Sequence, residues 1–507
     1  MTASRVSSSG APAVINGHDA ANEIGVRTVQ NYVGGHWVAS DATRFGEVRN
    51  PATDALIARV PLGGTTDVHR AVLAAQKAYP AWRATPPVQR VKPLFKLKSL
   101  LEEHFDDLAR VCTLEHGKTL DESRSSVRRA IDNVDLAVGI PDRMMGTSLE
   151  DIAAGIDCHT VRQPLGVFAA ITPFNFPVMV PMWFLPHAVA CGNTFLVKPS
   201  ERVPLSQVRM FELMHDAGFP EGVVNLVHGA KDAVDAILDH PGIAGVSFVG
   251  SSPVAHYIYK RAAERGKRVQ ALGGAKNFVV VMPDADIPRA AQVSTESCFG
   301  CAGERCLANS VVLAVGDAHA KIRDRLIDEA RKITVGDGLE AGVTMGPIIT
   351  KQHREKILGY IEKGIAEGAK LVLDGRGYKD PKNTAGYFLG PTIFDEVKPE
   401  MVIAREEIFG PVLCVMKAKD FDEAVEIVRK HELGNATSIF TSSGKWAREY
   451  RYRVEPSMLG VNIGVAAPMA FFPFGGAKGS FYGDLKAHGR DAVEFYTDKK
   501  VVITRWF

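Results

Sequence analysis

Three cysteines lie close together in the sequence, at Cys298, Cys301 and Cys306. They could hold a metal ion, act as buried structural thiols, or include one reactive nucleophile. A tetrahedral metal site needs further Cys or His ligands, and no Cys or His pair follows at the usual spacing. Cys306 directly follows Arg305, whose positive charge favours the thiolate form of a neighbouring thiol. We therefore expect no metal, while burial and nucleophilic reactivity both stay open at this point.

Residues 248–252 have the composition of a phosphate-binding turn. The common dinucleotide signature GxGxxG does not occur in the sequence. In its place, a strand end is followed by Gly250, Ser251 and a second serine, and Pro253 then suits the first turn of a helix. The N–H groups of such a turn can bind a pyrophosphate, although many similar junctions are only turns.

Lys198 and Glu201 follow an apolar segment that we expect to be a buried strand. Both charged groups would then emerge at the carboxyl edge of the sheet, where doubly wound sheets bind ligands. Either side chain could bind ribose hydroxyl groups, and the Glu201 carboxylate would repel a 2′-phosphate, which favours NAD over NADP. A solvated loop is the alternative interpretation.

Strands and helices alternate around these residues, which predicts a parallel, doubly wound sheet. A helix over 62–79, with Thr65 or Thr66 as its N-cap, and a long helical pattern over 88–138 precede the sheet. We expect its strands at 166–171, 194–197, 223–227, 245–249 and 268–272, and helices between them at 204–217 and 233–239.

A second cycle of strands and helices begins near Lys276 and predicts a second α/β domain. The C-terminal run 493–506 alternates weakly and ends in aromatic residues, which suits pairing with a neighbouring subunit. We expect strands at 278–281, 310–315, 412–416 and 438–440, and helices at 318–333, 352–368 and 421–431.

The composition excludes several classes of protein. A chain of 507 residues suggests about two to four domains and enough core to fold without disulfides. Its 60 Lys and Arg residues nearly balance its 58 Asp and Glu residues, so we expect no nucleic-acid partner. Seven cysteines are too few for a disulfide scaffold, and their odd number favours a reducing compartment.

No Asp, Glu, Lys or Arg occurs between Arg162 and Lys198, a stretch long enough to span a membrane. Its prolines would break the hydrogen bonds of a membrane helix, so we expect no membrane but a buried strand, a loop and a buried helix. The first residues, about 25, predict a disordered tail rather than a secretory signal. We expect a cytoplasmic protein, or a mitochondrial matrix protein in a eukaryote.

A series of motifs over about residues 30 to 500 resembles the NAD(P)-dependent aldehyde dehydrogenase superfamily, and the motifs occur in the order of that superfamily. They are YVGG at 32–35, NPAT at 50–53, TPFNFP at 172–177, GNT at 192–194, KPSE at 198–201, FVGS at 248–251, GERC at 303–306, EEIFGP at 406–411 and PFGGAK at 473–478.

The resemblance implies an α/β fold of three parts. A Rossmann-like, doubly wound NAD-binding domain would comprise residues 27–148 and 168–273, and an α/β catalytic domain would comprise 274–480. A small β arm from 149–167 and 481–507 would mediate a homo-oligomer, dimer or tetramer. Residues 1–26 would form a flexible tail.

The resemblance also assigns roles to single residues. Cys306 matches the family's nucleophile, which attacks the aldehyde carbon, and Cys301 becomes a structural thiol. Asn175 matches the amide that, with the Cys306 N–H, holds the oxyanion. The NAD contacts that it implies are Lys198 and Glu201 at the adenosine ribose, Gly250 and Ser251 at the pyrophosphate, Glu407 and Phe409 at the nicotinamide ribose, and Phe174.

One departure from the family motif concerns the base that activates the hydrolytic water. Hydrolytic members carry Glu-Leu-Gly-Gly-Lys, and alignment on Lys276 places Leu272 at the position of that glutamate. Leucine cannot deprotonate water, and Gln270 does not repair the loss. The thioester on Cys306 would therefore wait for a better nucleophile, such as the thiol of coenzyme A.

This departure, with further motifs at 274–277, 481–484 and 495–497, resembles the CoA-acylating methylmalonate-semialdehyde dehydrogenases. That subfamily binds a substrate carboxylate with two arginines, which match Arg129 and Arg305. Arg128 is the rival of Arg129 in register, and a surface salt bridge is the alternative role. Glu304 stands where the subfamily usually has Gln, which places an additional acidic group near the thiol.

We therefore expect NAD-dependent oxidation of methylmalonate or malonate semialdehyde, with transfer of the acyl group to coenzyme A and release of CO₂. A hydrolytic aldehyde dehydrogenase that produces a free acid is the first alternative. A catalytically silent binding or structural protein with this fold is the second, and the presence of both Asn175 and Cys306 argues against it.

Overall fold

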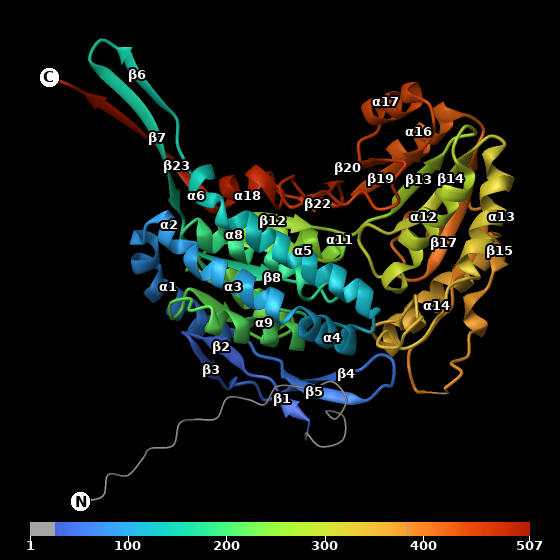
Figure 1. Ribbon diagram of the computed structural model, residues 1–507, viewed down its shortest axis with the longest axis horizontal. Coiled ribbons are helices and arrows are strands. Elements are labelled where there is room, and N and C mark those ends of the chain that lie inside the picture. Colours follow the sequence, from blue (N-terminus) through green and yellow to red (C-terminus); the bar gives the residue numbers. More distant parts are fainter. Residues whose placement is uncertain (1–25, 383) are drawn as a thin grey trace, which may run out of the picture.

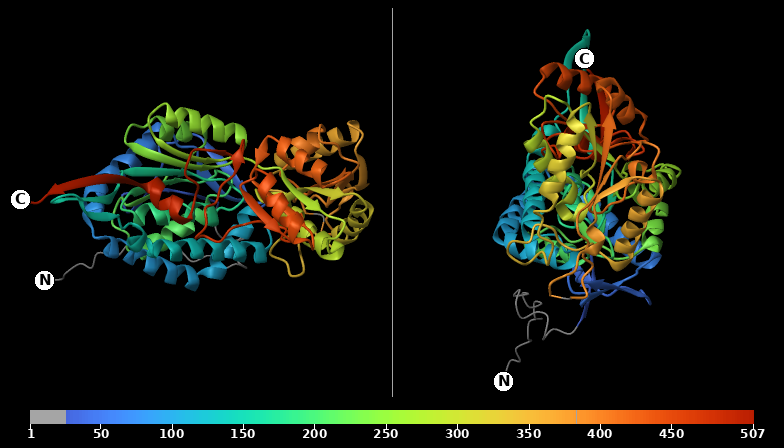
Figure 2. Two further views of the ribbon diagram at one scale, coloured as in Figure 1. Left: turned by 90° about the horizontal axis from the view of Figure 1, so that it is seen from above. Right: turned by 90° about the vertical axis from the view of Figure 1, so that its right-hand side faces the viewer.

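The structure is a computed structural model that describes residues 26–382 and 384–507. These residues form an eight-stranded sheet, a seven-stranded sheet and a three-stranded arm (Figure 1). The arm and the seven-stranded sheet lie at opposite ends of the eight-stranded sheet (Figure 2). The expected α/β architecture is confirmed, whereas residues 1–25 of the expected tail lie outside the described residues.

The eight-stranded sheet comprises β2 (Asn31–Val33), β3 (His36–Val38), β8 (Val167–Ile171), β9 (Thr194–Lys198), β10 (Val224–Leu226), β11 (Ile243–Val249), β12 (Arg268–Leu272) and β22 (Phe481–Tyr482). Its centre is parallel in the order β12-β11-β8-β9-β10, and the other three strands extend the edges in antiparallel orientation. In β8, Phe168 and Ala170 face one core, while Ala169 and Ile171 face the other. Both faces are buried, which explains why the strand is apolar throughout.

Helices cover both faces of this sheet. One face is covered by α1 (Thr65–Ala84), α10 (Lys231–Asp239) and α11 (Ser252–Ala263). The other face is covered by α3 (Lys92–Glu103), α4 (Phe105–His116), α5 (Leu120–Val138), α7 (Met179–Met182), α8 (Leu185–Ala190), α9 (Leu205–Asp216) and α18 (Gly489–Tyr496). The short helices α2 (Pro87–Arg90) and α6 (Ile140–Arg143) lie beside them.

The start of α1 differs from the sequence expectation. The helix begins at Thr65 and its N-cap is Gly64, which has no side chain to cap it, so neither Thr65 nor Thr66 is the cap. Asp67 in the first turn is buried instead, and it accepts hydrogen bonds from Asn31 Nδ2 at 3.0 Å and Ser40 Oγ at 2.7 Å. Its negative charge also suits the positive end of the helix dipole.

The seven-stranded sheet has the order β15-β16-β17-β14-β13-β19-β20, and all neighbours are parallel except β15 and β16. Its strands are β13 (Asn277–Val281), β14 (Asn309–Val315), β15 (Lys370–Leu373), β16 (Thr392–Asp395), β17 (Val412–Ala418), β19 (Ala436–Phe440) and β20 (Met458–Val461). Its helices are α12 (Ile287–Phe299), α13 (Ala318–Ala330), α14 (Lys351–Ala366), α15 (Val402–Arg405), α16 (Phe421–Lys430) and α17 (Gly444–Arg453), with the 3₁₀ turns η1 (Gly300–Gly303) and η2 (Gly375–Gly377).

Two small sheets complete the body. They are formed by β1 (Arg27–Thr28), β4 (Phe45–Arg49) and β5 (Leu56–Pro61), and by β18 (Leu433–Gly434) with β21 (Ala477–Lys478). No helix in the described part of the chain is long and apolar enough to cross a membrane. The uncharged stretch before Lys198 forms β8, a loop and the short helices α7 and α8, followed by β9.

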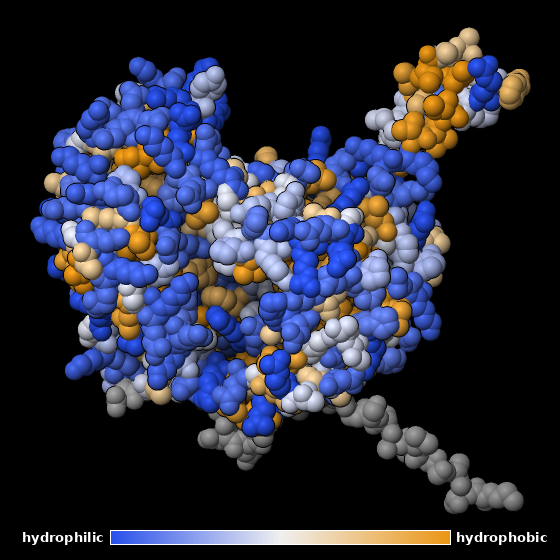
Figure 3. Space-filling model, turned by 180° about the vertical axis from the view of Figure 1, so that it is seen from behind, coloured by the Kyte–Doolittle hydropathy of each residue, from blue (hydrophilic) through white to orange (hydrophobic). Residues whose placement is uncertain are grey.

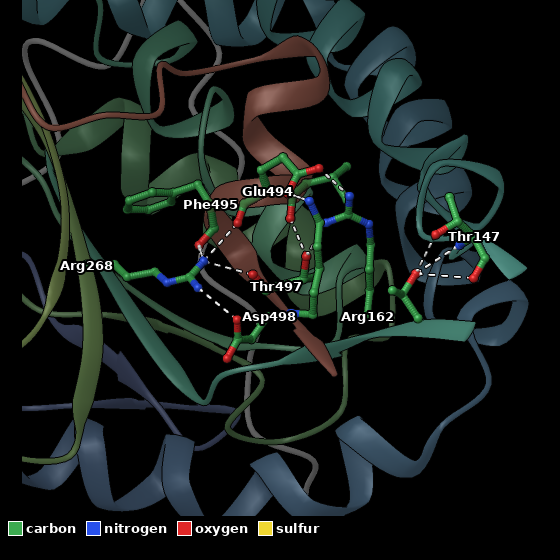
Figure 4. Close-up of polar contacts among 10 residues, drawn as sticks. Thr147, Arg162, Arg268, Glu494, Phe495, Thr497 and Asp498 are labelled. Carbon is green, nitrogen blue, oxygen red and sulfur yellow. Dashed lines mark hydrogen bonds and ion pairs between the residues drawn. The ribbon is translucent and has the colours of Figure 1, made fainter. Parts of the chain in front are cut away.

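The arm is an antiparallel sheet of β6 (Ser148–Ala153), β7 (Ile156–Pro164) and β23 (Thr497–Arg505). Two arginines fix it to the body (Figure 4): Arg268 on β12 donates to the carbonyls of Glu494, Phe495 and Thr497, and Arg162 pairs with Glu494. The region differs from the sequence expectation, because β22 pairs with β12 and residues 489–496 are helical. The C-terminal strand pairs with β7 of its own chain.

Candidate active site

The turn before Cys306 has an unusual backbone. Directly after α12, Cys301 and Ala302 have φ of 51° each and Gly303 has φ of 75°. Left-handed geometry costs a non-glycine residue roughly 1–2 kcal/mol. The turn is held by the Glu122 carboxylate, which accepts a hydrogen bond from Cys301 N at 2.5 Å, and by Glu304 N, which donates to Cys301 O at 2.9 Å. After this turn the chain reaches Cys306, which lines a cavity beside the start of β13 and the segment before β17.

Cys306 lines a small cavity with Arg305, Glu407, Phe409 and Asn277. Burial and, to a smaller extent, the carboxylate of Glu407 raise the pKa of the Cys306 thiol to about 12. Arg305 and the N–H groups of Cys306 and Leu307 oppose this shift in the pKa of the thiol only in part. Arg305 thus favours the thiolate, as its charge predicts, but desolvation has the larger effect on the pKa of the thiol.

Asn175 lies in the loop between β8 and α7 and is buried. Its Nδ2 donates to the carbonyl of Glu304 at 3.1 Å, two residues before Cys306. The ammonium of Lys118 donates to the carbonyl of Asn175 and lies 3.9 Å from the centre of the Phe176 ring. The structure thus brings Asn175 to the turn that carries Cys306, although the two are 131 positions apart in the sequence.

The residues expected at the cofactor adenosine and pyrophosphate lie at the carboxyl ends of neighbouring strands. Lys198 ends β9 and lies 3.4 Å from the Glu201 carboxylate. Gly250 follows β11, and Ser251 is the N-cap residue of α11, where its side chain makes no capping hydrogen bond. Since β9 and β11 flank β8 in the sheet, these groups border the loop of Asn175.

Glu407 and Phe409 reach the site from the segment before β17. Glu407 accepts a hydrogen bond from Ala275 N at 2.9 Å, and burial raises the pKa of its carboxyl to about 7. The Phe409 ring meets Phe174 edge to face, with ring centres 5.7 Å apart. His353 Nε2 lies 2.8 Å from the Phe409 carbonyl, at hydrogen-bond distance. Phe174 and Phe409 therefore form one aromatic wall of the site.

Of the two candidate carboxylate-binding arginines, Arg129 is part of helix α5 and Arg305 lies beside the first turn of that helix. The Arg305 guanidinium donates to Cys301 Sγ at 3.5 Å and lies 3.8 Å from Glu122 Oε1, in the first turn of α5. Arg129 follows Glu122 by seven residues, which is two turns, or about 10 Å, along the same face. Its guanidinium donates to the Pro468 carbonyl at 3.0 Å.

The rival residue Arg128 faces away from the site. Its guanidinium pairs with both oxygens of Glu102, at 2.6 and 2.9 Å, on the surface between α5 and α3. The geometry thus separates the two neighbouring arginines: Arg128 forms the surface salt bridge, and Arg129 contacts the loop before β21.

Comparison with known proteins agrees with this arrangement. Residues 37–502 match the model of the Aldehyde dehydrogenase family. The chain belongs to this family. It is 52% identical over 480 residues to malonate-semialdehyde dehydrogenase 2 of Geobacillus thermodenitrificans, which covers 94% of this chain and 99% of that protein.

The chain is also similar to solved structures of the same family. The methylmalonate-semialdehyde dehydrogenase of Oceanimonas doudoroffii is 45% identical with a TM-score of 0.93, covering 95% of this chain and 99% of the other. A second structure, of a Sinorhizobium meliloti protein assigned as a methylmalonate-semialdehyde dehydrogenase, was solved with NAD. It is 42% identical with a TM-score of 0.94, and the match covers 95% of this chain and 98% of the other.

In this aldehyde dehydrogenase, Leu272 is buried at the end of β12. Gln270 is buried inside the sheet, where its Nε2 donates to Ser247 Oγ at 2.9 Å. Neither side chain is a base that could activate a water molecule for attack on the acyl carbon of a thioester at Cys306. Glu407 is the carboxylate whose charge acts on the Cys306 thiol.

Glu304 is fully buried, and burial raises the pKa of its carboxyl well above the ordinary value. One oxygen accepts a hydrogen bond from Ile349 N at 3.2 Å, and the other lies 4.0 Å from His116 Nε2. A protonated carboxyl has nearly the shape and the neutral charge of the glutamine amide. The shift favours this neutral form, so the acidic residue at this position in the aldehyde dehydrogenase is closer in charge to glutamine than a solvated glutamate would be.

Sequence reasoning missed four residues of this aldehyde dehydrogenase site. Lys118 contacts the backbone of Asn175, and the side-chain amides of Asn277 and Asn435 contact that of Cys306. Only for Glu122 did the sequence contain a signal, because Thr119 and Glu122 have the spacing of a capping box, and the structure forms it. The other contacts depend on tertiary neighbours.

Proposed function

We propose that this aldehyde dehydrogenase oxidises methylmalonate or malonate semialdehyde with NAD and transfers the acyl group to coenzyme A. The products are propionyl-CoA or acetyl-CoA, CO₂ and NADH. The observation that carries the proposal is the combination of Cys306 with Leu272 at the position of the hydrolytic base. Relatives at about 50% identity that are named malonate-semialdehyde dehydrogenases support the substrate class.

The cofactor edge of the sheet has groups that suit NAD. Lys198 and Glu201 would bind the adenosine ribose, and the first turn of α11 after Gly250 and Ser251 would hold the pyrophosphate. Glu407 and Phe409 would contact the nicotinamide ribose, with Phe174 beside them. When bound, NAD supplies the hydride acceptor. The partly exposed carboxylate of Glu201 disfavours the additional phosphate of NADP.

Cys306 is the proposed nucleophile. Its sulfur attacks the aldehyde carbon, and the carbonyl oxygen becomes an oxyanion between Asn175 Nδ2 and the Cys306 N–H. Asn175 uses one N–H on the Glu304 carbonyl, which leaves its second N–H for this oxyanion. The carbonyl then reforms as a hydride leaves the former aldehyde carbon, and the product is a thioester on Cys306.

The thioester would be cleaved by a thiol rather than by water. Leu272 offers no proton acceptor for a water molecule, whereas a CoA thiolate needs no base at that position. Its sulfur bonds to the acyl carbon, and Cys306 leaves as thiolate. Arg129 and Arg305 would hold the carboxylate of the semialdehyde before it departs as CO₂, and the carbon that carried it then takes up a proton. The hydrolytic alternative lacks both the base and the support of the relatives.

The test is the dependence of turnover on coenzyme A. With malonate semialdehyde and NAD, we expect at most one fast equivalent of NADH per site without CoA, followed by slow turnover. Addition of CoA should restore continuous NADH formation and produce acetyl-CoA, detected by mass spectrometry. Full steady-state turnover without CoA, with free acid as the product, would overturn the acyl transfer.

We also propose that the arm mediates a homo-oligomer, either a dimer or a tetramer. Several large apolar side chains of the arm face solvent (Figure 3), including Leu149 at 63%, Val501 at 61%, Ile503 at 67% and Trp506 at 65% exposure. A contiguous exposed apolar patch of this kind is typical of an interface. The residues lie on both outer strands, so a second chain would cover them.

A further inference from the structure

Two asparagine side chains hold the peptide unit that joins Cys306 to Leu307. The carbonyl oxygen of Cys306 accepts one hydrogen bond from Asn277 Nδ2 at 2.9 Å and another from Asn435 Nδ2 at 3.0 Å. Both asparagines are buried, with 1% and 5% of their surfaces exposed. A carbonyl oxygen has two lone pairs, so the two amides satisfy it completely and fix the orientation of the peptide plane.

The opposite edge of the same peptide plane carries the N–H of Leu307. In a planar trans peptide the C=O and the following N–H point in opposite directions. The amides of Asn277 and Asn435 hold the carbonyl on one side and so fix the direction of the Leu307 N–H. This N–H, together with that of Cys306, lowers the pKa of the thiol and so offsets part of the effect of burial.

We propose that Asn435 is a positioning residue for the nucleophile, because its amide orients the Cys306–Leu307 peptide so that the Leu307 N–H stabilises negative charge on the sulfur. The inference rests on the proposed role of Cys306 and adds a residue to that site. The effect of Asn435 on the sulfur should be the same for every aldehyde substrate, since the contact involves the enzyme alone.

Asn435 tests this role more cleanly than Asn277. Asn277 also donates to the Ala308 carbonyl at 3.0 Å and accepts from Ala436 N at 3.0 Å, so its loss would disturb β13, β14 and β19. Asn435 lies between β18 and β19, and its backbone carbonyl accepts from Met458 N at 3.2 Å. Replacement of its side chain leaves that backbone contact in place.

Other charges around the thiol stay constant when Asn435 is replaced. In the described part of the chain, Glu407 raises the pKa of Cys306 from the segment before β17, and Arg305 lowers it from the preceding residue. Neither side chain hydrogen-bonds to Asn435. A change in thiol reactivity in an Asn435 variant would therefore report the orientation of the peptide rather than a new charge.

The experiment compares the alkylation of Cys306 in Asn435→Leu, which keeps the volume but has no N–H donor, with the wild-type enzyme. A second variant, Asn435→Ala, is measured in parallel in case leucine does not fit. The matched control is Asn225→Ala, because Asn225 is another buried asparagine whose Nδ2 donates to a backbone carbonyl, that of Gly222 at 2.8 Å, in the eight-stranded sheet. Iodoacetamide labelling of the Cys306 peptide is followed by mass spectrometry between pH 6 and 10, without substrate or CoA.

Loss of one hydrogen bond to a thiolate raises its pKa by roughly one unit. At a fixed pH below this pKa we therefore expect about ten-fold slower alkylation in both Asn435 variants and a wild-type rate in Asn225→Ala. Values of kcat/KM for malonate semialdehyde and for propanal should fall by the same factor, while the Kd for NAD stays unchanged.

A wild-type alkylation profile in a folded Asn435 variant would overturn the proposal, and so would an equal slowing in Asn225→Ala. Cys306→Ala is the control for the underlying function. If that variant kept its NADH production, the nucleophile itself would be wrong, a result distinct from an unaltered thiol in the Asn435 variants.

Discussion

Burial is the common cause of the protonation states in the site. It raises the pKa of Cys306 to about 12 and that of Glu407 to about 7, and it raises the pKa of Glu304 well above its ordinary range. These shifts favour the neutral forms of Cys306 and Glu304, which avoid uncompensated charge in a poorly solvated cavity. As the proposed nucleophile, Cys306 would therefore lose its proton during the reaction cycle, and the N–H groups of Cys306 and Leu307 lower the cost of that step.

The arginine pair gives a prediction at the residue scale. Arg129→Lys and Arg305→Lys replace a planar two-pronged donor by a single ammonium, so bidentate binding of a carboxylate is lost. We expect kcat/KM for malonate semialdehyde to fall roughly ten- to a hundred-fold, the equivalent of one charged hydrogen bond. Steady-state kinetics with propanal, which has no carboxylate, should show a much smaller loss.

Arg128→Lys is the matched control for this prediction, because Arg128 is the neighbouring arginine and pairs with Glu102 on the surface. It should leave both values of kcat/KM close to those of the wild-type enzyme. Equal losses on malonate semialdehyde and propanal in the Arg129 and Arg305 variants would show that neither binds the carboxylate.

The residues of the site lie at or next to the ends of helices and strands. Helix α12 ends directly before the left-handed turn of Cys306, β8 ends before the loop of Asn175, and α5 begins at the capping box that contains Glu122. Glu122 therefore caps the start of its own helix and also accepts a hydrogen bond from Cys301 N at 2.5 Å. A single carboxylate couples the start of α5 to the position of the nucleophile turn.

Gly303→Ala tests the importance of this turn. A Cβ at residue 303 would lie 2.1 Å from the Gly410 carbonyl oxygen, and the residue has φ of 75°. We expect loss of activity and a loss of stability of about 2 kcal/mol or more, since strain and overlap add. Thermal unfolding and NADH formation would measure the two effects.

Gly266→Ala provides the comparison for Gly303→Ala. Gly266 has a similar φ of 69°, but nothing lies within 4 Å of its added Cβ. This variant should lose only about 1–2 kcal/mol of stability from backbone strain and keep its activity. If Gly303→Ala behaved in the same way, the close approach of Gly410 would not matter for the site.

The whole molecule combines two α/β units with an arm whose apolar face is left to solvent. The arm is continuous with the body, because Arg268 at the start of β12 binds three carbonyls at the end of α18 and the start of β23 (Figure 4). A partner that covers the arm would therefore also stabilise the edge of the eight-stranded sheet. Oligomerisation and the stability of the eight-stranded sheet are expected to be linked.

Ile503→Asp on β23 tests the proposed interface. A charge in the centre of the exposed arm surface should be expelled from a buried interface, so we expect the mass measured by light scattering to fall towards that of the 54.9 kDa chain. Tyr452→Asp on α17 is the control, because Tyr452 is 87% exposed at the other end of the molecule. An unchanged mass in Ile503→Asp would argue against an interface at the arm.

Buried histidines predict a loss of stability in acid. Burial lowers the pKa of His187 from 6.5 to about 4 and that of His228 to about 3. Between pH 6.5 and these values the unfolded chain binds more protons than the folded protein, so stability falls as the pH falls. From pH 7 to pH 5, each of these histidines should cost about 2 kcal/mol.

His187→Phe should therefore show a smaller decrease in Tm between pH 7 and pH 5 than the wild-type protein. His187 is fully buried, and no group in the described part of the chain forms a well-aligned hydrogen bond with either ring nitrogen, so phenylalanine can replace it with little loss of polar contact. His36→Gln is the control, because the His36 side chain is 71% exposed. The same decrease in all three proteins would exclude His187 as a source of the acid sensitivity.

The sequence by itself determined which chemistry is available and the order of the elements. The apolar runs and their turns predicted the strands β8, β9, β11 and β12 to within two residues, because a strand buried on both faces is apolar throughout. The local motif around Cys306 and the replacement at Leu272 were visible as single residue types. These features are local, so neighbouring positions in the chain are sufficient to recognise them.

Only the tertiary structure decided how these residues act on one another. The adjacent charge of Arg305 favours the thiolate and lowers the pKa of Cys306, but burial, which depends on the packing of distant segments, raises that pKa by more. Likewise, Arg128 and Arg129 are indistinguishable in sequence until their partners, Glu102 and Pro468, are known. The contact between Asn435 and Cys306 joins residues 129 positions apart, and no pattern of neighbours in the sequence could predict it.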